Sequence, residues 1–295
     1  MNGAIIVVYK PDFSMVERLL TRVYSQVEHV IIIDNSPEKH NFESIISSYH
    51  YEHFPENVGI ARGHNHGLRM LLTLGCEYGL LLDQDSLIPE DMVFRLTSLL
   101  QASRAMKHDL AAIGPSIKCS FTQRSERARY QRDIFDYDEL VGVNQIIASG
   151  MLIDLGALDE VGYKDESLFI DGVDHEWCWR AKSKGLNVAR AKHVEMVHRL
   201  GDSRSKFVGV TYRVGSPIRL YYQFRNIFIL SRRPYVPLYW KVRCISLMPV
   251  KFILNSIMQK HRKQRCLFMM QGIMDGLLGK RNCYKDNWSR TDNFL

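Results

Sequence analysis

The hydrophobic positions along the chain predict a sheet of buried strands joined by helices. Continuous apolar runs occur at residues 4–9, 29–34 and 78–83, and runs with no polar face are typical of strands covered on both sides. Residues 15–27 and a later segment that ends near Leu74 have instead the spacing of helices with one apolar face. Strands that alternate with helices in this way predict a doubly wound α/β fold with a mostly parallel central sheet.

The alternation continues less regularly after residue 83. The pattern predicts further strands at residues 51–54, 111–115, 143–149 and 186–191, and helices at 89–105, from near Leu155 and at 174–184. The polar, basic stretch 116–138 has no clear period, which predicts an irregular loop over the sheet. Helical spacing returns at residues 212–230 and 239–278. We therefore expect an α/β domain over residues 1–202, followed by a helical region over residues 203–295.

Charge changes sign at about the same boundary. Residues 201–295 hold 18 Lys and Arg against 4 Asp and Glu, a net charge of +14, so the preceding 200 residues carry −7 of the chain's total of +7. A basic region of this kind could meet nucleic acid, an anionic lipid surface or a phosphorylated substrate. Composition alone does not choose among these partners.

The remaining features of the composition indicate a cytoplasmic protein. The six cysteines are scattered without a Cys-x-x-Cys pair, which argues against a zinc site or a disulfide framework. The first residues lead straight into an apolar strand without a basic start or a cleavage site, so we expect no secretory signal. No apolar run approaches the roughly 20 residues that are needed to span a bilayer.

The strand at residues 78–83 ends in two carboxylates, Asp83 and Asp85. The carboxyl edge of an open α/β sheet is where such folds bind ligands. Two neighbouring carboxylates repel each other unless a cation or proton joins them, and Mg²⁺ or Mn²⁺ prefers oxygen ligands. We interpret this motif as a metal site that receives a phosphate. The alternative is a polar turn in which Asp85 and Ser86 cap the next helix.

A glycine-rich segment, residues 57–67, leads into the helix that ends near Leu74. Glycines and a lone Arg62 at the start of a helix suit an anion, because free backbone N–H groups point outward there. The spacing fits neither a dinucleotide-binding fingerprint nor a P-loop, and a simple tight turn is the alternative.

Asp174 is expected near the start of the helix at 174–184, where the helix dipole stabilises its anion and keeps it ready to accept a proton. The alternative is a helix cap with Trp177 and Arg180 on a packed face. His198 could be a metal ligand or a structural histidine. In the same way, the aromatic and arginine residues of 219–226 could stack on sugar or belong to the core.

The C-terminal pattern allows two interpretations. Residues 239–278 combine bulky apolar side chains at helical spacing with Lys and Arg, as in helices that lie in the plane of an anionic membrane. A helical subdomain with a solvated basic face is the other possibility.

Seven short motifs follow one another in the order typical of inverting family 2 glycosyltransferases. They are Val8-Tyr9-Lys10-Pro11, Ile33-Asp34-Asn35-Ser36, Asn57-Val58-Gly59 through Asn65-His66-Gly67, Asp83-Gln84-Asp85, Ala148-Ser149-Gly150, the run Val173 to Arg180, and the run His198 to Asp202. Each motif is weak alone, but their order is specific. The chain resembles that family over about residues 1–226, and within it the bacterial rhamnosyltransferases that build surface polysaccharides.

This resemblance implies a GT-A fold, a nucleotide-sugar donor and a divalent cation, Mg²⁺ or Mn²⁺. The nucleotide-binding half would be about residues 1–115 and the acceptor half about 116–202. The implied donor contacts are Tyr9 and Asp34 for the base, Asn57, Gly59 and Arg62 for ribose and diphosphate, and Asp83, Ser149 and Gly150. The implied metal ligands are Asp85 and His198, with Asp83 beside them.

The resemblance further implies that Asp174 is the catalytic base. Val173 replaces the first acid of the family's Glu-Asp pair, which leaves Glu176 as an alternative base. Trp177 would stack on an acceptor sugar, and Arg225 and Asn226 would lie near the donor phosphates or the acceptor.

The expected function is transfer of L-rhamnose from dTDP-L-rhamnose to a polyprenyl-diphosphate-linked glycan in O-antigen or related polysaccharide biosynthesis. The protein would then be cytoplasmic and peripheral at the inner face of the cell membrane, with no nucleic-acid partner. One alternative is transfer of another nucleotide-activated hexose. Another is a non-catalytic protein whose basic region binds nucleic acid, which predicts strongly salt-dependent binding.

Overall fold

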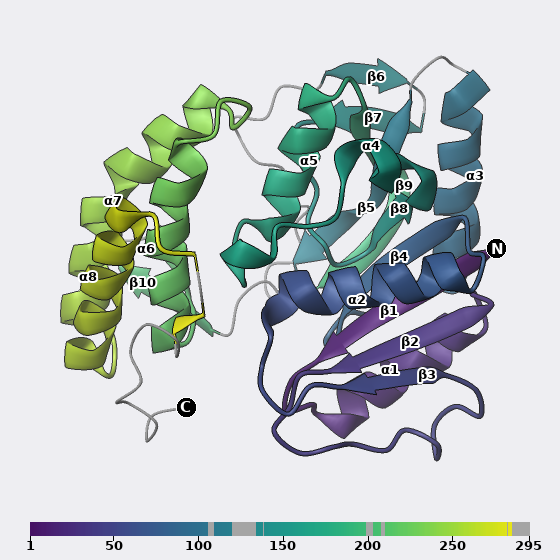
Figure 1. The fold of residues 1–295 in the computed structure, drawn as a ribbon, viewed down its shortest axis with the longest axis horizontal. Coiled ribbons are helices and arrows are strands. Elements are labelled where there is room, and N and C mark those ends of the chain that lie inside the picture. Colours follow the sequence, from purple (N-terminus) through teal and green to yellow (C-terminus); the bar gives the residue numbers. More distant parts are fainter. Residues whose placement is uncertain are drawn as a thin grey trace. The chain divides into compact units, whose positions relative to one another are not determined.

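The computed structural model describes residues 1–105, 109–119, 134–137, 139–198, 203–207, 210–281 and 283–284 (Figure 1). Its internal contacts divide the chain into two units. The sheet unit comprises Met1–Lys164 and Trp177–Leu200, and the helical unit comprises Asp165–Glu176 and Gly201–Leu295. The sequence had placed residues 165–176 in the α/β domain, whereas the structure groups them with the C-terminal helices.

The sheet unit contains one mixed sheet, in which nine strands of the described chain lie in the order β3-β2-β1-β4-β8-β5-β9-β7-β6. The neighbours β3, β2, β1 and β4 run parallel, as do β5 and β9, while β8 runs antiparallel to β4 and β5, and β7 to β6 and β9. The strands are β1 (Asn2–Val8), β2 (His29–Asp34), β3 (His50–His53), β4 (Tyr78–Asp83), β5 (Leu110–Cys119), β6 (Phe135–Tyr137), β7 (Leu140–Val143), β8 (Met151–Asp154) and β9 (Asn187–His198).

Helices cover both faces of this sheet, which confirms the predicted fold class. Side chains of α1 (Phe13–Tyr24) and α3 (Met92–Ala105) share one buried cluster with the strands. Side chains of α2 (Gly59–Thr73), α4 (Leu158–Val161) and α5 (Val173–Ser183) belong to a second cluster. Two short 3₁₀ turns, Leu155–Ala157 and Glu166–Leu168, precede α4 and α5.

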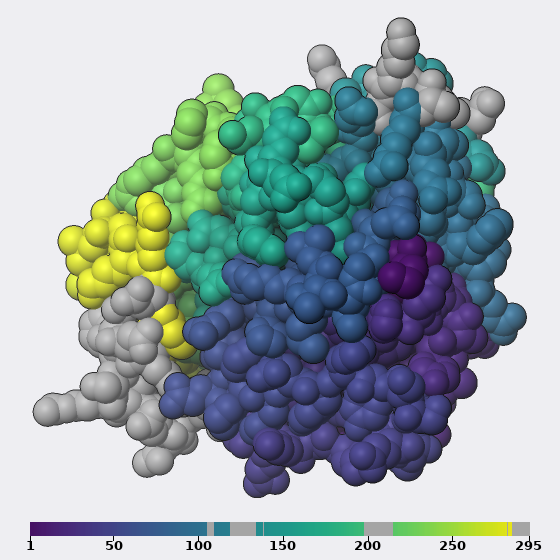
Figure 2. Space-filling view, turned by 45° about the vertical axis from the view of Figure 1, so that its right-hand side comes forward, coloured from purple at the N-terminus to yellow at the C-terminus, as the bar shows by residue number. Residues whose placement is uncertain are grey.

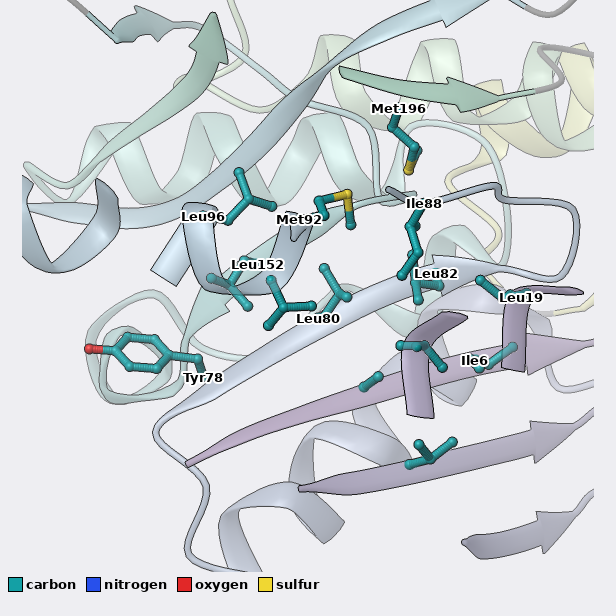
Figure 3. Packing of buried hydrophobic residues seen from close by; sticks show 14 of the residues in the cluster. Ile6, Leu19, Tyr78, Leu80, Leu82, Ile88, Met92, Leu96, Leu152 and Met196 are labelled. Carbon is teal, nitrogen blue, oxygen red and sulfur yellow. The ribbon is translucent and has the colours of Figure 1, made fainter. Parts of the chain in front are cut away.

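The alternation of side chains along each strand explains why the central strands are apolar throughout. Ile6 and Leu82 point into the cluster with α1 and α3, where they pack near Leu19 and Met92 (Figure 3). Ile5, which precedes Ile6 on β1, belongs to the cluster on the other face of the sheet. On the face of the molecule seen in Figure 2, the purple and blue N-terminal part has a closed surface, in keeping with these fully buried strands.

Some predicted boundaries are wrong. Residues 144–149 form no strand, because β7 ends at Val143, and the helix expected from Pro89 begins at Met92. The strand expected at 186–191 continues to His198. The stretch 116–138 is not a loop throughout, because its first residues extend β5 to Cys119 and β6 lies near its end; residues 120–133 and 138 lie outside the described chain.

The helical unit contains α6 (Pro217–Ser231), α7 (Leu238–Met258), α8 (Arg262–Leu278) and the antiparallel pair β10 (Ser203–Phe207) and β11 (Val210–Val214). Helices α6 and α8 approach closely at two glycines of α8. A Cβ atom at Gly272 would lie 2.4 Å from the Tyr221 carbonyl oxygen, and one at Gly276 2.8 Å from that of Arg225. The Tyr221 hydroxyl also donates to the buried Asp275 carboxylate at 2.8 Å. No helix within the described residues is both long enough and apolar enough to cross a bilayer.

Candidate active site

Three parallel strands bring the first candidate side chains to one edge of the sheet. In the register of β1 with its neighbours, Val8 pairs with Asp34 of β2 and Val7 pairs with Asp83 of β4. Asp34 and Asp83 are therefore the last residues of the two strands that flank β1. Both lie beside the end of β1, which Tyr9 follows directly. The sequence predicted this edge as the ligand site, and the pairing confirms that these strand ends lie together.

The Asp83-Gln84-Asp85 motif forms a turn in which the Ser86 N–H donates to the Asp83 carbonyl at 3.0 Å. The Gln84 side chain ties this turn to the end of β1. Its amide oxygen accepts from the Tyr9 N–H at 2.8 Å, and its amide nitrogen donates to the Tyr9 carbonyl at 3.3 Å. The middle residue of the motif thus continues the β1–β4 ladder beyond the last strand residue. The Tyr9 ring itself is partly exposed.

Two further segments hold the same turn. The Ser86 hydroxyl hydrogen-bonds the Ser149 hydroxyl, and the Gly150 N–H donates to the Leu81 carbonyl at 2.8 Å. Both Ser149 and Gly150 are buried, so they support the turn from within the protein. Contact of these two residues with substrate stays a prediction.

The end of β9 reaches this turn as well. The Leu87 N–H donates to the Val197 carbonyl at 3.3 Å in an isolated antiparallel bridge. This bridge places the backbone of His198 next to a segment that begins two residues after Asp85, although 113 positions separate the two residues in the sequence. The side chain of His198 lies outside what the structure describes.

The donor set at this turn fits a divalent cation that is completed by substrate phosphates. Asp83 and Asp85 are partly exposed carboxylates on one turn. Among the described side chains, no group of three or more His, Cys, Asp or Glu could hold a metal ion by itself. Mg²⁺ and related ions are often held by one or two carboxylates together with phosphate oxygens, and this arrangement needs no larger protein cluster.

Asp34 is fully buried, and its carboxylate shapes the loop that follows β2. One oxygen accepts from the Ser36 N–H at 2.9 Å, and the other accepts from the Tyr51 hydroxyl at 2.8 Å and lies 2.8 Å from His40 Nδ1. Burial would raise the pKa of Asp34, but these hydrogen bonds outweigh burial and lower it. Burial together with the bond to Asp34 raises the pKa of Tyr51 to about 12.

This carboxylate holds the loop from Ser36 to His40, and the Ser36 hydroxyl in turn accepts from the Lys10 N–H at 2.8 Å. Asp34 thus shapes the loops beside Tyr9, and its contact with a nucleotide base stays a prediction.

The glycine-rich segment begins α2 as predicted. The Asn57 side chain accepts from the Gly59 N–H at 2.9 Å, and Gly59 has a φ of 83°, a conformation that favours glycine. The N-cap residue, Val58, makes no side-chain cap hydrogen bond. Arg62 is exposed in the first turn, with its guanidinium 6.0 Å from the centre of the Phe54 ring. Donor binding by Asn57, Gly59 and Arg62 stays a prediction.

Asp174 lies in the first turn of α5, where its carboxylate accepts from the His175 N–H at 3.0 Å and is partly exposed. It belongs to the helical unit, and the division between the two units falls between Glu176 and Trp177 within α5. The convergence of Asp174 and Asp85 on one sugar therefore stays a prediction.

Glu176 is the alternative base, and its surroundings argue against that role. Its side chain has no exposed surface. Its carboxylate pairs with the Arg233 guanidinium at 2.8 Å and accepts from the Tyr235 hydroxyl at 2.6 Å. Arg233 also pairs with Asp165. Burial and donation to Glu176 raise the pKa of Tyr235 to about 12. This network fixes Glu176 inside the protein and leaves Asp174 as the candidate base.

Trp177 is part of the core of the sheet unit. Its ring is fully buried in the cluster with α2 and α4, and its indole N–H donates to the Gly162 carbonyl at 2.8 Å. A ring without an exposed face cannot stack on an acceptor sugar. That prediction is wrong, and the alternative interpretation of Trp177 as a packed residue is confirmed.

Arg225 and Asn226 are also buried, so they do not line a substrate surface. The Arg225 guanidinium donates to the Ser167 carbonyl at 2.8 Å, and the Asn226 amide donates to three main-chain carbonyls of residues 168–171. The predicted contacts with donor or acceptor are replaced by bonds to the segment before α5.

Sequence reasoning missed the supporting residues of both regions. Gln84 lies between the two carboxylates of its motif. Its polar side chain at a strand end was the signal that could have identified it as a supporting residue. His40 and Tyr51 gave no signal, because their contact with Asp34 depends on the tertiary fold. The same holds for Arg233 and Tyr235, which lie more than 55 positions from Glu176.

Comparison with known proteins agrees with this geometry. Residues 4–141 match the model of the family described as Glycosyl transferase family 2. The dTDP-rhamnosyl transferase RfbF of Shigella flexneri is 28% identical over 94% of this chain and 95% of its own length. The low-salt glycan biosynthesis hexosyltransferase Agl10 of Haloferax volcanii is 24% identical over 77% of this chain and 74% of its own length.

Solved structures show the same fold at low sequence identity. GalNAc-T7, in a crystal structure with UDP, GalNAc and Mn²⁺, aligns with a TM-score of 0.55 and 11% identity over 99% of this chain. The present chain spans 58% of the length of that protein. The S. aureus TarS fragment 1–349 in complex with UDP-GlcNAc aligns with a TM-score of 0.55 and 11% identity over 93% of this chain and 81% of TarS.

The fold of the chain matches solved glycosyltransferase structures of the GT-A fold. The match to the family model begins at the first strand and includes the Asp83-Gln84-Asp85 turn. Over these residues the chain is similar to glycosyltransferase family 2.

Proposed function

We propose that this protein is an inverting glycosyltransferase that moves L-rhamnose from dTDP-L-rhamnose to a polyprenyl-diphosphate-linked oligosaccharide in surface polysaccharide synthesis. The observation that carries the proposal is the turn at Asp83 to Ser86, which is bonded to Tyr9, to Ser149 and, through Leu87, to the end of β9. The choice of rhamnose rests on the likeness to RfbF over nearly the whole chain. The nucleic-acid alternative has no comparable support.

On the donor side, the exposed groups around this turn provide the binding surface. Tyr9 offers a partly exposed ring for the base, and Arg62 and the start of α2 offer positive potential for the diphosphate. Asp83 and Asp85, with His198, would hold Mg²⁺ or Mn²⁺. When bound, the cation supplies charge stabilisation for the departing nucleoside diphosphate.

On the acceptor side, Asp174 takes the proton of the attacking hydroxyl. The hydroxyl oxygen then displaces nucleoside diphosphate from the anomeric carbon in one in-line step, which inverts the configuration at that carbon. The position of Asp174 in the first turn of α5 stabilises its anion, so that it is ready to accept a proton.

We propose further that the helical unit lies against an anionic membrane, where a polyprenyl-linked acceptor resides. Helix α7 carries an exposed stripe of Leu238, Val242, Val250, Ile253 and Ile257, and α8 carries another of Leu267, Met270, Met274 and Leu277. Residues 238–263 contain six Lys and Arg and no Asp or Glu. Lys241 and Lys251 donate to Arg233 and Gln223 within the unit, whereas Arg243, Lys260, Arg262 and Lys263 are exposed. An anionic lipid surface matches both these exposed charges and the apolar side chains.

A donor panel tests the transferase proposal. Purified protein with Mg²⁺ or Mn²⁺ would be assayed for nucleoside diphosphate release with dTDP-L-rhamnose, dTDP-glucose, UDP-glucose, UDP-galactose and UDP-GlcNAc, in the presence of membrane extract as the source of acceptor. We expect release with dTDP-L-rhamnose alone. Release with another donor would retain the transferase and refute the sugar, and no release with any donor would refute the proposal.

Variants assign the roles within that assay. Asp85→Ala should lose metal-dependent turnover, and Asp174→Asn should lose turnover while it retains nucleotide binding. Asp159→Asn is the matched control, because Asp159 is also an acid in the first turn of a helix, is exposed, and lies outside the candidate site. An active Asp174→Asn enzyme would remove Asp174 from the role of base.

A further inference from the structure

The segment that leads to Asp174 has a strained backbone. Phe169 has a φ of 63° and a ψ of −64°, and the Ile170 N–H donates to the Leu168 carbonyl at 2.7 Å, which closes a γ-turn of the rare positive-φ type. Asp171 also has a φ of 63°, and Gly172 follows at 90°. A residue other than glycine in such a conformation is strained, and the conformation persists only where the surrounding structure enforces it.

Helix α6 supplies that enforcement from one face. The side-chain amide nitrogen of Asn226 donates to the carbonyls of Leu168, Ile170 and Asp171 at 2.9, 2.8 and 2.9 Å. The Asn226 amide oxygen accepts from Arg225 Nε at 3.1 Å, so the orientation of the amide is itself fixed.

Two arginines of α6 complete the set of bonds. Arg225 donates to the Ser167 and Leu168 carbonyls at 2.8 and 3.1 Å. The Arg219 guanidinium forms a two-pronged pair with the Asp171 carboxylate, with Nε and Nη2 each at 2.9 Å. Such paired hydrogen bonds between planar groups fix orientation as well as distance.

An aromatic contact from the same helix holds the centre of the γ-turn. The Phe169 ring is stacked on the Tyr222 ring, with the centroids 4.5 Å apart and the planes at 8°. Positions 219, 222 and 226 are three and four residues apart, so their side chains lie on one face of α6. A single side of this helix therefore contacts the whole segment.

We propose that Arg219, Arg225 and Asn226 are positioning residues that hold the segment 167–172 and thereby place the Asp174 carboxylate for proton transfer. This inference rests on the proposed role of Asp174 as base. The held segment begins α5 directly, because the Gly172 carbonyl accepts from the Glu176 N–H at 2.9 Å. A catalytic group displaced by about 1 Å can cost roughly 100-fold in rate, so side chains of α6 that hold the segment before α5 can have a large effect on turnover.

Arg219→Ala is the test variant, because this side chain is about one-third exposed and its removal leaves the core intact. We expect its kcat to fall roughly 10- to 100-fold, with the KM for donor and the affinity for nucleoside diphosphate unchanged, since the donor-binding candidates belong to the sheet unit. Arg219→Lys should restore part of the loss. Asn226→Ala should lower kcat in the same way, with its melting temperature recorded beside it.

Arg232→Ala is the matched control. Arg232 follows α6 and also donates to main-chain carbonyls, but those belong to Phe228 of α6 itself and to Gly276 and Leu277 of α8, and none belongs to the segment 167–172. Its loss should therefore leave kcat unchanged. A purely structural role of α6 would instead make Arg232→Ala and Arg219→Ala equally harmful.

Combination with Asp174→Asn separates the two proposals. If α6 acts through Asp174, Arg219→Ala should not lower further the residual turnover of Asp174→Asn. A wild-type rate for Asp174→Asn would refute the assignment of the base. An inactive Asp174→Asn enzyme together with an Arg219→Ala enzyme within about twofold of wild-type kcat would overturn the positioning role alone.

Discussion

Replacing Ile253 and Ile257 by serine should weaken binding of the protein to anionic vesicles by a predictable amount. Fully burying an isoleucine side chain gains about 1.5–3 kcal/mol, and these two are 55% and 59% exposed, so each has roughly 1 kcal/mol left to gain at a lipid surface. Their joint loss removes about 2 kcal/mol, which corresponds to a roughly 30-fold weaker partition.

Vesicle sedimentation measures this change directly. The full-length protein would be mixed with vesicles of phosphatidylcholine and phosphatidylglycerol, and the bound fraction followed against lipid concentration. Phe94→Ser is the matched control, because Phe94 is 74% exposed on α3 in the sheet unit, and its loss should leave binding unchanged.

A second pair of substitutions separates the charge from the apolar contribution. Arg262 and Lys263 are exposed at the start of α8, and each basic residue near an anionic surface contributes about 1 kcal/mol. Arg262→Ser with Lys263→Ser should therefore weaken binding strongly at low salt and little at high salt, where screening has already removed the attraction. The isoleucine pair should show the same deficit at both salt concentrations.

Failure of the wild-type protein to sediment with anionic vesicles would refute the membrane contact. Binding of the isoleucine-pair variant as tight as that of wild type would refute it equally, because the stripe on α7 would then not be in contact with lipid. A dimer that the isoleucine pair abolishes would assign the stripe to a second copy of the chain and refute the membrane proposal.

Three further predictions concern the fold and the strand-end turn. Gly272→Ala should lower the free energy of unfolding by about 1–3 kcal/mol in urea titrations, because the new methyl group would meet the Tyr221 carbonyl. Asp34→Asn should lower the free energy of unfolding by about 1–3 kcal/mol at pH 7. Because the folded pKa of Asp34 lies below its unfolded value, the difference in stability from wild type should shrink as the pH falls through that lowered pKa. Urea titrations at pH 7 and pH 3 check this. Gln84→Ala should weaken nucleoside diphosphate binding roughly 3- to 10-fold in calorimetry, because it frees the Tyr9 backbone from the turn; an unchanged affinity would contradict the supporting role of Gln84.

The positions that the sequence predicted well are those whose signal is local. The strand that ends at Asp83 is recognisable because five apolar residues in succession must be buried on both faces, and the structure places it inside the sheet, between β1 and β8. The helix start at Gly59 is recognisable because glycine and asparagine suit the backbone there. Local patterns of this kind fix where a side chain stands along an element.

The roles that the sequence predicted poorly depend on contacts between distant residues. Trp177 and Glu176 are neighbours on α5, and nothing in their spacing shows that one enters the core beside Gly162 while the other pairs with Arg233. The strand expected at 143–149 fails for the same reason, since an apolar run does not show whether a partner strand lies beside it. Partner identity is a tertiary property, so motif position alone cannot distinguish a residue that touches substrate from one that supports it.

The grouping of residues 165–176 with the C-terminal helices changes how the helical unit is understood. The sequence presented it as an extension after a finished catalytic domain, whereas the structure makes it the unit that contains Asp174. The same unit carries the exposed apolar stripes and the basic residues that we assign to the membrane. The proposed acceptor is anchored in lipid, and the proposed base must meet its hydroxyl. In these proposals one unit therefore provides both the membrane contact and the base. The residues proposed to bind the water-soluble donor belong to the sheet unit.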